Sequence, residues 1–142
     1  MSAERVFIDT NVIVYAYDRD AGRKRDLARG ILADLWNASG GILSVQILQE
    51  FFVTVTKKIR SPLSAAAARE IVEDYLSWEV VPNDGESVLA AIDIQAAEKI
   101  SFCDALVIAA AEKGGADILL SEDLAAGRKF RSVTVRNPFA AV

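Results

Sequence analysis

Short apolar runs alternate along the chain with longer segments in which apolar residues recur every three or four positions. The short runs have the length of buried strands, whereas the spacing in the longer segments is that of helices with one face on a core. Strands are expected at residues 6–8, 42–44, 79–81, 117–120 and 133–135. Strands that alternate with helices predict an α/β fold of three layers, α/β/α, with a mostly parallel central sheet of four to five strands.

Helices are expected between these strands, at residues 10–17, 21–38, 45–58, 65–78, 86–99 and 103–111. The helical period predicts core-facing stripes of Leu27, Ile31 and Leu35 with Trp36 beside them, of Ile71, Val72, Tyr75 and Leu76, and of Val88, Leu89, Ile92 and Ala96. The helix at 45–58 carries apolar residues around nearly its whole circumference, so we expect it to be buried on more than one side. With the helix that follows, it forms an αα-hairpin suited to a clip or a dimer surface.

The first and fourth strands both stop in a polar cluster. Asp9-Thr10-Asn11 follows the first, and Ser121-Glu122-Asp123 follows the fourth. Ligands of open α/β sheets bind outside the carboxyl ends of the strands, so carboxylates placed there face a crevice and not the core. Thr10 or Asn11 is suited to cap the helix that follows, although Asp9 could itself be no more than that cap.

Two further acids stand in helices that are otherwise largely apolar. An unpaired ionised carboxylate at Glu50 would cost several kcal/mol if buried, so it needs a route to the surface, a cationic partner or a metal. A solvated patch with Gln46 and Gln49 is the alternative. Asp104 lies in the first turn of the alanine-rich last helix, where a negative charge also favours the helix dipole.

The composition restricts the chemistry. The 142 residues are 52% hydrophobic, which fits one compact domain over residues 1–142. The absence of histidine excludes Ser-His and Cys-His catalysis and the usual zinc ligands, and the single cysteine, Cys103, excludes an intrachain disulfide. No apolar run approaches the roughly 20 residues of a membrane span, and residues 1–5 do not begin a signal segment. We therefore expect a cytoplasmic protein without membrane contact.

Four acids are expected to meet at one edge of the sheet, because strand ends and helix starts converge there. They are Asp9, Glu50, Asp104 and Asp123. Carboxylates that lie close together repel one another unless divalent cations neutralise them, and oxygen-only ligands suit Mg²⁺, with Mn²⁺ able to substitute. A metal-bound water can attack a phosphodiester while the ion stabilises the transition state, so this chemistry requires no histidine.

Residues 6–17, 44–52, 101–111 and 119–139 resemble the conserved blocks of PIN-domain ribonucleases, specifically the VapC toxins of bacterial toxin–antitoxin pairs. The motifs that carry the likeness are Asp9-Thr10-Asn11, Ser101-Phe102-Cys103-Asp104-Ala105 and Ser121-Glu122-Asp123-Leu124. The resemblance implies that the four acids Asp9, Glu50, Asp104 and Asp123 bind the metal and carry catalysis. It also implies that Asn11 orients the site and that Ser121 fills the small-hydroxyl position before the last acid. Cys103 departs from the tryptophan that close relatives often carry, which bears on local packing and substrate fit.

By the same resemblance the protein is a Mg²⁺-dependent endoribonuclease that cleaves RNA, forms a homodimer and is inhibited by an antitoxin with a basic side chain in the acidic site. With a net charge of -4, the chain needs local cations to approach RNA. The candidates are Arg23, Lys24, Arg25, Lys57, Lys58, Arg128 and Lys129. The candidate dimer surface consists of Phe51, Phe52, Tyr75 and Trp78. Glu122 stands beside Asp123 and is expected to replace it in part.

Other functions also begin with a strand that ends in an acid. Aspartyl-phosphate phosphatases require a second Asp two positions after Asp9, where this chain has Asn11. A phospho-accepting receiver domain would need an acid beside Asp9 and a lysine after a late strand, and here Ser121-Glu122-Asp123 follows that strand. A catalytically degenerate PIN module that binds RNA or protein is the stronger rival, but all four acids are intact, which favours an enzyme.

Overall fold

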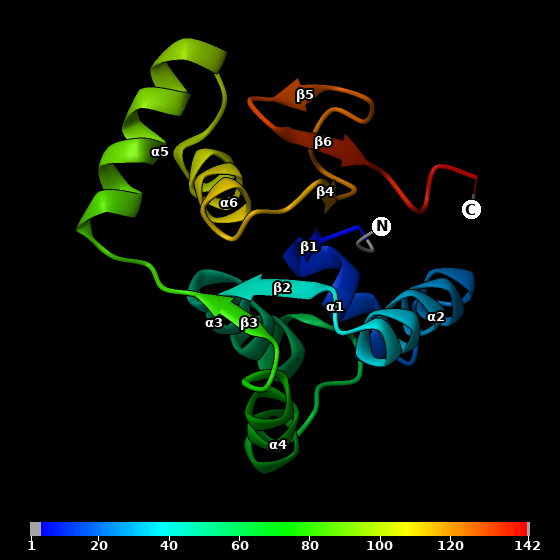
Figure 1. The fold of residues 1–142 in the computed structure, drawn as a ribbon. Helices are drawn as coiled ribbons and strands as arrows, with labels where there is room; N and C mark the ends of the chain where they lie inside the picture. The colour runs from blue at the N-terminus through cyan, green and yellow to red at the C-terminus, as the bar shows by residue number, and fades with distance from the viewer. Residues whose placement is uncertain (1–3, 142) are drawn as a thin grey trace.

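Six strands form one central sheet in the order β3-β2-β1-β4-β6-β5 (Figure 1). The computed structural model describes residues 4–141, so the expectation for residues 1–3 lies outside it. The strands are β1 (Val6–Ile8), β2 (Gly41–Ser44), β3 (Glu79–Val81), β4 (Ile118–Leu120), β5 (Lys129–Phe130) and β6 (Val133–Arg136). Neighbouring strands are parallel except β5, which pairs antiparallel with β6. The predicted fold is confirmed, with β5 as an additional strand that is too short for an apolar run to predict.

The chain reverses its direction across the sheet beside β1. From β1 it adds β2 and β3 on one side, and it then returns to add β4 on the other side, followed by β6. The carboxyl ends of β1 and β4 therefore flank a topological switch point, where open α/β sheets leave a crevice. Asp9 follows β1 and Ser121 follows β4, so both stand at this crevice.

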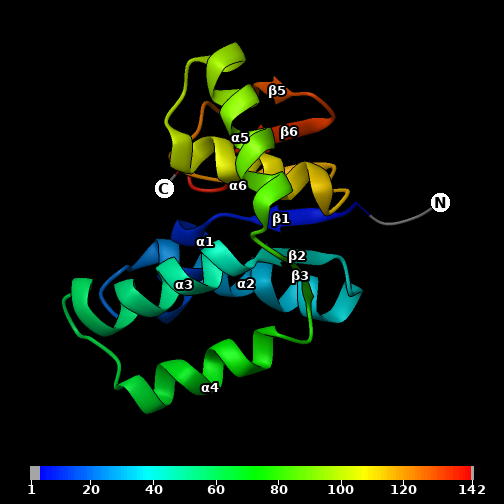
Figure 2. The same ribbon diagram turned by 90° about the vertical axis from the view of Figure 1, so that its left-hand side faces the viewer.

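Helices cover both faces of the sheet. They are α1 (Thr10–Tyr17), α2 (Arg23–Ala38), α3 (Val45–Val53), α4 (Ala65–Tyr75), α5 (Gly85–Glu98) and α6 (Phe102–Lys113). Figure 2 shows α5 and α6 on one side of the strands and α1 to α4 on the other, which gives the three layers. Within residues 4–141, no helix is long and apolar enough to cross a bilayer.

The helix α6 is buried almost all round, as its apolar sequence predicts. Ala105, Ile108 and Ala111 have no exposed surface, and the alanine side chains allow α6 to pack closely on the sheet, with α5 outside it. At the C-terminal end of α6, the carbonyl of Gly114 accepts a hydrogen bond at 2.7 Å from Arg5, which precedes β1. The opposite end of α6, which carries Asp104, therefore lies toward the carboxyl ends of the strands.

The helix α5 turns a different face to the core from the one that the apolar period predicts, whereas α2 keeps its predicted stripe of Leu27, Ile31 and Leu35 against the core. The buried residues of α2 are Ala28, Leu32 and Leu35, with Leu27 and Ile31 half-buried and Trp36 exposed. The buried residues of α5 are Ser87, Ala91 and Ile94, with Val88, Leu89, Ile92 and Ala96 exposed. The small residues Ser87 and Ala91 on the inner face of α5 allow it to pack closely on α6, so close helix packing decided the orientation of α5 over the size of its apolar side chains.

The segment predicted as a helix at 45–58 is helical over that whole length, but its last part differs in type. The α-helix α3 ends at Val53, and a single π turn, η1 (Thr54–Lys58), continues it. Phe52 and Val53 are exposed, so the expectation of burial around the whole circumference is wrong at the end of the helix. In α4, Tyr75 is buried, whereas Ile71 and Val72 are half-buried and Leu76 is exposed. The two helices pack together as the predicted αα-hairpin.

Candidate active site

Asp9 lies at the end of β1 and caps α1. Its backbone N–H donates to the carbonyl of Leu120 at 2.9 Å, which extends the pairing of β1 with β4 by one residue. Its Oδ1 accepts from the backbone N–H of Thr10 at 2.8 Å, and its Oδ2 accepts from the Ser121 hydroxyl at 2.7 Å. Asp9 therefore caps α1, as the alternative interpretation of the sequence held, and the expectation that Thr10 or Asn11 caps this helix is wrong. One carboxylate oxygen caps the helix and the other holds the neighbouring strand end.

Burial raises the pKa of Asp9 to about 6, against an ordinary value of 3.8. The hydrogen bonds from Ser121 and Thr10 oppose this shift, while the negative charges of Asp123 and Glu50 add to it. The side chain is only 7% exposed. Asp9 is thus a buried carboxylate beside two other carboxylates, and a cation in this site would stabilise its charged form.

Ser121 and Asn11 join the ends of β1 and β4. Besides donating to Asp9, the fully buried Ser121 hydroxyl accepts from the backbone N–H groups of Asp123 and Leu124, at 3.2 and 3.3 Å. The Asn11 side chain donates to Asp123 Oδ2 at 3.1 Å and accepts from the backbone N–H of Glu122 at 3.3 Å. Both side chains orient the turn that carries Asp123, which itself is exposed.

Glu50 reaches the same region from α3. Its Oε2 accepts from the Thr10 hydroxyl at 3.3 Å, and its Oε1 accepts from Gln46 Nε2 at 2.9 Å. Gln46 also lies 3.5 Å from the carbonyl of Cys103, at the start of α6. Gln46 is buried, so the alternative of a solvated patch does not hold for it, although Gln49 is exposed. Thr10 and Gln46 were not anticipated as site residues, although the spacing of four between Gln46 and Glu50 places both on one helix face.

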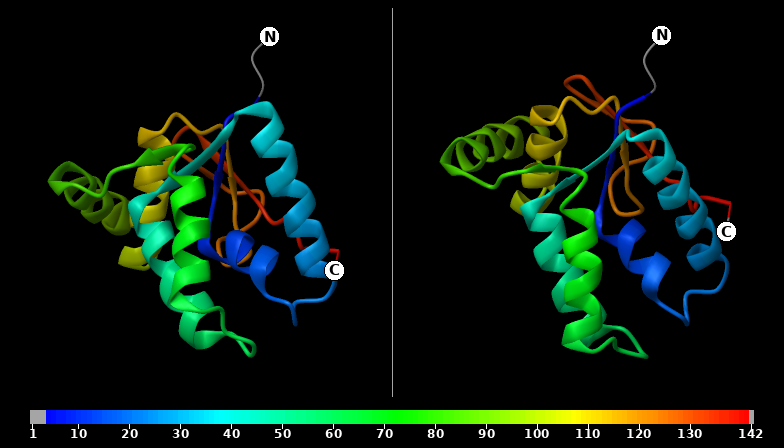
Figure 3. Two further views of the ribbon diagram at one scale, coloured as in Figure 1. Left: turned by 90° about the horizontal axis from the view of Figure 1, so that it is seen from below. Right: turned by 60° about the horizontal axis from the view of Figure 1, so that its bottom comes forward.

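Asp104 directly follows Cys103, the residue whose carbonyl lies near Gln46. Its backbone N–H donates to the Ser101 hydroxyl at 3.1 Å, which caps α6, and its side chain is half-buried. Figure 3 shows α1, α3 and α6 approaching the end of the sheet toward which β1 runs. The charges of Glu50 and Asp123 thus lie near enough to Asp9 to raise its pKa. Within residues 4–141 no side chain donates a hydrogen bond to the Asp104 carboxylate.

The candidate metal ligands at this site are all carboxylate oxygen atoms. In the described part of the chain, no three carboxylate or thiol side chains already form a group ready to hold a metal ion. Neutral donors hold the carboxylates individually, which is the arrangement that mutual repulsion favours without a cation. The buried Asp9, with its raised pKa and carboxylate neighbours, fits a hard divalent cation such as Mg²⁺. The exposed Cys103 contributes only its backbone carbonyl to these contacts.

Glu122 points away from this cluster. Its carboxylate accepts from the Tyr15 hydroxyl and from Lys24 Nζ, both at 2.5 Å. Partial burial by itself would raise the pKa of Glu122, but the hydrogen bonds from Lys24 and Tyr15 lower it. Both carboxylate oxygens are engaged, so the expectation that Glu122 could replace Asp123 finds no support in its contacts.

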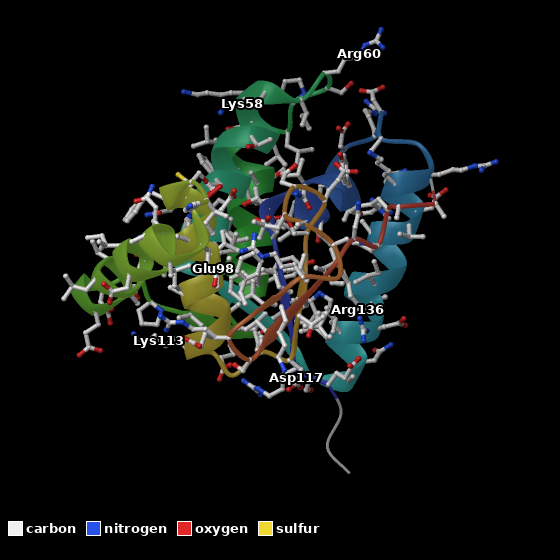
Figure 4. All side chains as sticks on the ribbon, turned by 90° about the horizontal axis from the view of Figure 1, so that it is seen from above. Lys58, Arg60, Glu98, Lys113, Asp117 and Arg136 are labelled. Atoms are coloured by element: carbon white, nitrogen blue, oxygen red, sulfur yellow. The ribbon has the colours of Figure 1, made fainter. Side chains whose placement is uncertain are left out.

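A hollow of about 300 Å³ adjoins Glu50 on the side of η1. It is lined by Thr10, Gln49, Glu50, Val53, Thr54 and Lys58. Figure 4 shows Lys58 and Arg60 at the opposite end of the molecule from Asp117, which directly precedes β4. Lys58 therefore lies on the side of the sheet at which the strands end.

The family model of the PIN domain matches residues 6–131, a range that includes Asp9, Glu50, Asp104 and Asp123. The chain belongs to the PIN-domain family. The six strands and the helices on both faces are therefore a PIN fold, as the sequence motifs indicated.

Solved structures of toxin–antitoxin proteins share this PIN fold. A toxin–antitoxin complex from Klebsiella pneumoniae superposes with a TM-score of 0.69 at 14% identity, over 94% of this chain and 97% of that one. VapC20 from Mycobacterium tuberculosis, a toxin that cleaves the sarcin–ricin loop, superposes with a TM-score of 0.61 at 20% identity, over 83% of this chain and 91% of that one. DNA-bound VapBC from Salmonella typhimurium superposes with a TM-score of 0.64 at 18% identity, over 96% of this chain and 99% of that one. No curated protein sequence matches the chain significantly.

Proposed function

We propose that this PIN-domain protein is a Mg²⁺-dependent endoribonuclease and the toxin of a toxin–antitoxin pair. The observation that carries the proposal is the buried Asp9 carboxylate at the switch point of the sheet. Ser121 holds it, and the charges of Glu50 and Asp123 lie near enough to raise its pKa. VapC20, one of the proteins with the same fold, cleaves the sarcin–ricin loop, which supports RNA as the substrate class.

The residues that would hold Mg²⁺ are Asp9, Glu50, Asp104 and Asp123. An ion held there would act as a Lewis acid, which would activate a water molecule for attack and stabilise the charge of the phosphodiester transition state. Ser121 keeps Asp9 turned toward the end of β4 and Asn11 holds Asp123. Thr10 and Gln46 direct the Glu50 carboxylate. The oriented carboxylates are suited to accept a proton from the attacking water, and no histidine is needed for that role.

The candidate RNA contacts are not equally available. Lys24 is paired with Glu122, and Arg25 is half-buried with its Nε enclosed by protein atoms, so neither is free to reach a phosphate without rearrangement. Arg23, Lys57 and Lys58 are exposed. Because Lys58 also lines the hollow beside Glu50, it is the cation best placed to neutralise a phosphate next to the cleavage site.

We further propose that the protein forms a homodimer and binds an antitoxin. Several proteins with the same fold are toxin–antitoxin complexes, which supports the antitoxin as a partner. Of the residues expected at the dimer surface, Phe51 and Tyr75 are buried in the core and Trp78 is half-buried, so they are not free for it. Phe52, the fourth expected residue, is exposed, and with exposed Val53 and Leu76 it lines a groove of about 480 Å³ between α3 and α4.

The deciding experiment incubates the purified, antitoxin-free protein with total RNA in the presence and absence of Mg²⁺ and maps new 5′ ends. We expect discrete ends that appear only with Mg²⁺ and vanish in Asp9→Asn. RNA that is bound but left intact by the wild type at any Mg²⁺ or Mn²⁺ concentration would instead identify a non-catalytic PIN module.

A further inference from the structure

Three side chains from separate segments meet beside the candidate site. Tyr15 comes from the last turn of α1, Lys24 from the first turn of α2, and Glu122 from the turn after β4. The Tyr15 hydroxyl and Lys24 Nζ each donate to a different oxygen of Glu122, at 2.5 Å, and Lys24 Nζ lies 5.0 Å from the centre of the Tyr15 ring. We call this set of Tyr15, Lys24 and Glu122 the Glu122 clamp.

The side chains of the Glu122 clamp pack against the protein and are partly enclosed by it. The buried ring of Phe139 packs edge-on against the Tyr15 ring, with centroids 5.0 Å apart and planes at 83°. The side chains of Lys24 and Glu122 are 31% and 24% exposed, which makes theirs the most enclosed ion pair between residues 4 and 141. A partly desolvated pair with two donors holds its acceptor more firmly than a surface pair does.

Glu122 lies between the two residues that the site uses at the end of β4. Its backbone N–H donates to Asn11, whose amide in turn donates to Asp123 Oδ2 at 3.1 Å. Asp123 is exposed, and within residues 4–141 its carboxylate has that one side-chain donor. The direction in which Asp123 points therefore depends on the backbone that Glu122 fixes.

We propose that Tyr15, Lys24 and Glu122 are positioning residues that set Asp123 toward Asp9 and Glu50 by locking the turn after β4. This inference rests on the proposed metal-dependent activity. Glu122 acts through Asp123 and does not bind the metal, because both of its oxygens face α1 and α2. Residues that orient metal ligands typically contribute about 10- to 100-fold in metal affinity or activity, so the clamp should have an effect of that size.

The first test measures Mn²⁺ binding to the RNA-free protein by electron paramagnetic resonance. Glu122→Gln, Tyr15→Phe and Lys24→Met should each weaken Mn²⁺ binding by about 10-fold or more. Two matched control variants should bind Mn²⁺ as tightly as the wild type does. Tyr17→Phe removes a hydroxyl from the same turn of α1, bonded at 3.3 Å to Tyr75, and Lys113→Met breaks the ion pair with Asp84, which caps α5. Lys24→Arg should restore most of the affinity, because it keeps a donor to Glu122.

The second test places Glu122→Gln in an Asp123→Asn background. If the clamp acts through Asp123, the double variant should bind Mn²⁺ and cleave RNA no worse than Asp123→Asn alone. If Glu122 were a metal ligand or a substitute for Asp123, the second change would cause a further large loss. Melting temperatures of all variants separate a loss of folding from a loss of positioning, since a purely structural clamp would lower the melting temperature additively in both backgrounds.

The outcomes distinguish this inference from the proposed function. Wild-type protein that neither binds Mn²⁺ nor cleaves RNA would overturn the proposed function and the clamp with it. Wild-type protein that does both, with Mn²⁺ affinities of Glu122→Gln and Tyr15→Phe equal to those of the controls, would overturn the clamp alone. If Glu122→Gln fails to fold, Tyr15→Phe decides the same question, because it removes a single hydroxyl.

Discussion

The two oxygens of Asp9 are held by donors from different parts of the chain, one at the start of α1 and one at the end of β4. Asn has nearly the same shape as Asp, but it removes the charge and puts an NH₂ donor in place of one of these two acceptor oxygens. We expect Asp9→Asn to lower metal-dependent cleavage by about 100-fold or more, with an unchanged or higher melting temperature, because burial disfavours the charged form. Glu50→Gln and Asp104→Asn should lower cleavage similarly. Cleavage assays and thermal melts measure both effects, and full activity of Asp104→Asn would contradict the site.

The burial of Asp9 also predicts how the stability of the metal-free protein depends on pH. Its pKa is about 6 in the folded protein and near 3.8 in the unfolded chain, so the folded state binds this proton more tightly. The Asp9 contribution therefore favours folding below pH 3.8 and is lost as the pH rises through 6. The loss is roughly 3 kcal/mol, since one pKa unit corresponds to about 1.4 kcal/mol.

Urea unfolding of wild type and Asp9→Asn in the presence of EDTA measures this contribution as a difference, in which the other titrating groups cancel. The difference in unfolding free energy should shift in favour of the variant as the pH rises from about 4 to about 7. A difference that stays constant over this range would show that Asp9 titrates normally.

Single residues were predictable where they directly follow a strand. Asp9 and Ser121 are in contact, as expected of residues at the ends of neighbouring parallel strands. The sequence left the cap of α1 open among Asp9, Thr10 and Asn11, because the backbone angles at Asp9 decide which of these three adjacent polar side chains reaches the free amides. The partners of Glu122 carried no sequence signal, since Lys24 and Tyr15 lie 98 and 107 positions away.

Among the secondary-structure elements, the π turn η1 offers a direct test of RNA binding. Its two adjacent lysines are both exposed, but Lys58 lines the hollow beside Glu50 and Lys57 does not. We expect Lys58→Ala to weaken binding of single-stranded RNA several-fold. The slope of log affinity against log salt concentration should fall by the amount that about one phosphate contact contributes, and Lys57→Ala should have a smaller effect on both. Fluorescence anisotropy at several salt concentrations, in the Asp9→Asn background, measures this. Equal losses from both lysines would argue for a diffuse cationic surface and against a contact at the hollow.

The elements themselves were predicted well, and the faces of some helices were not. Strand positions and helix positions follow from apolar period and from turn residues, which are local properties. The orientation of α5 follows from its packing on α6, in which Ala91 and Ile94 are buried and Val88 and Leu89 are exposed. The apolar period and the turn residues also do not predict the π turn η1, because a π turn carries no residue signature that distinguishes it from a continued α-helix.

For the whole molecule, the groove between α3 and α4 is the surface through which we expect the proposed homodimer to form. Leu76 is 58% exposed and lines this groove, whereas Leu89 is 65% exposed on α5, in a separate part of the fold. Burying exposed leucine stabilises association, and a charge in its place opposes it. We expect light scattering to give a dimer at micromolar concentration for wild type and Leu89→Glu, and a monomer for Leu76→Glu. A wild-type monomer, or a dimer disrupted by Leu89→Glu and not by Leu76→Glu, would place the interface elsewhere or remove it.

The acidic cluster predicts how an antitoxin would inhibit the proposed ribonuclease activity. An Arg or Lys side chain placed among Asp9, Glu50 and Asp123 would neutralise the same charge that Mg²⁺ neutralises, so inhibition requires no conformational change. Inhibition of RNA cleavage in the purified complex should therefore weaken as Mg²⁺ is raised, and should not weaken when NaCl is raised to the same ionic strength. Replacing the basic residues of the antitoxin segment that contacts the enzyme should release the activity at low Mg²⁺. Inhibition that survives that replacement, or that does not depend on Mg²⁺, would show that the antitoxin blocks access of RNA without competing for the metal site.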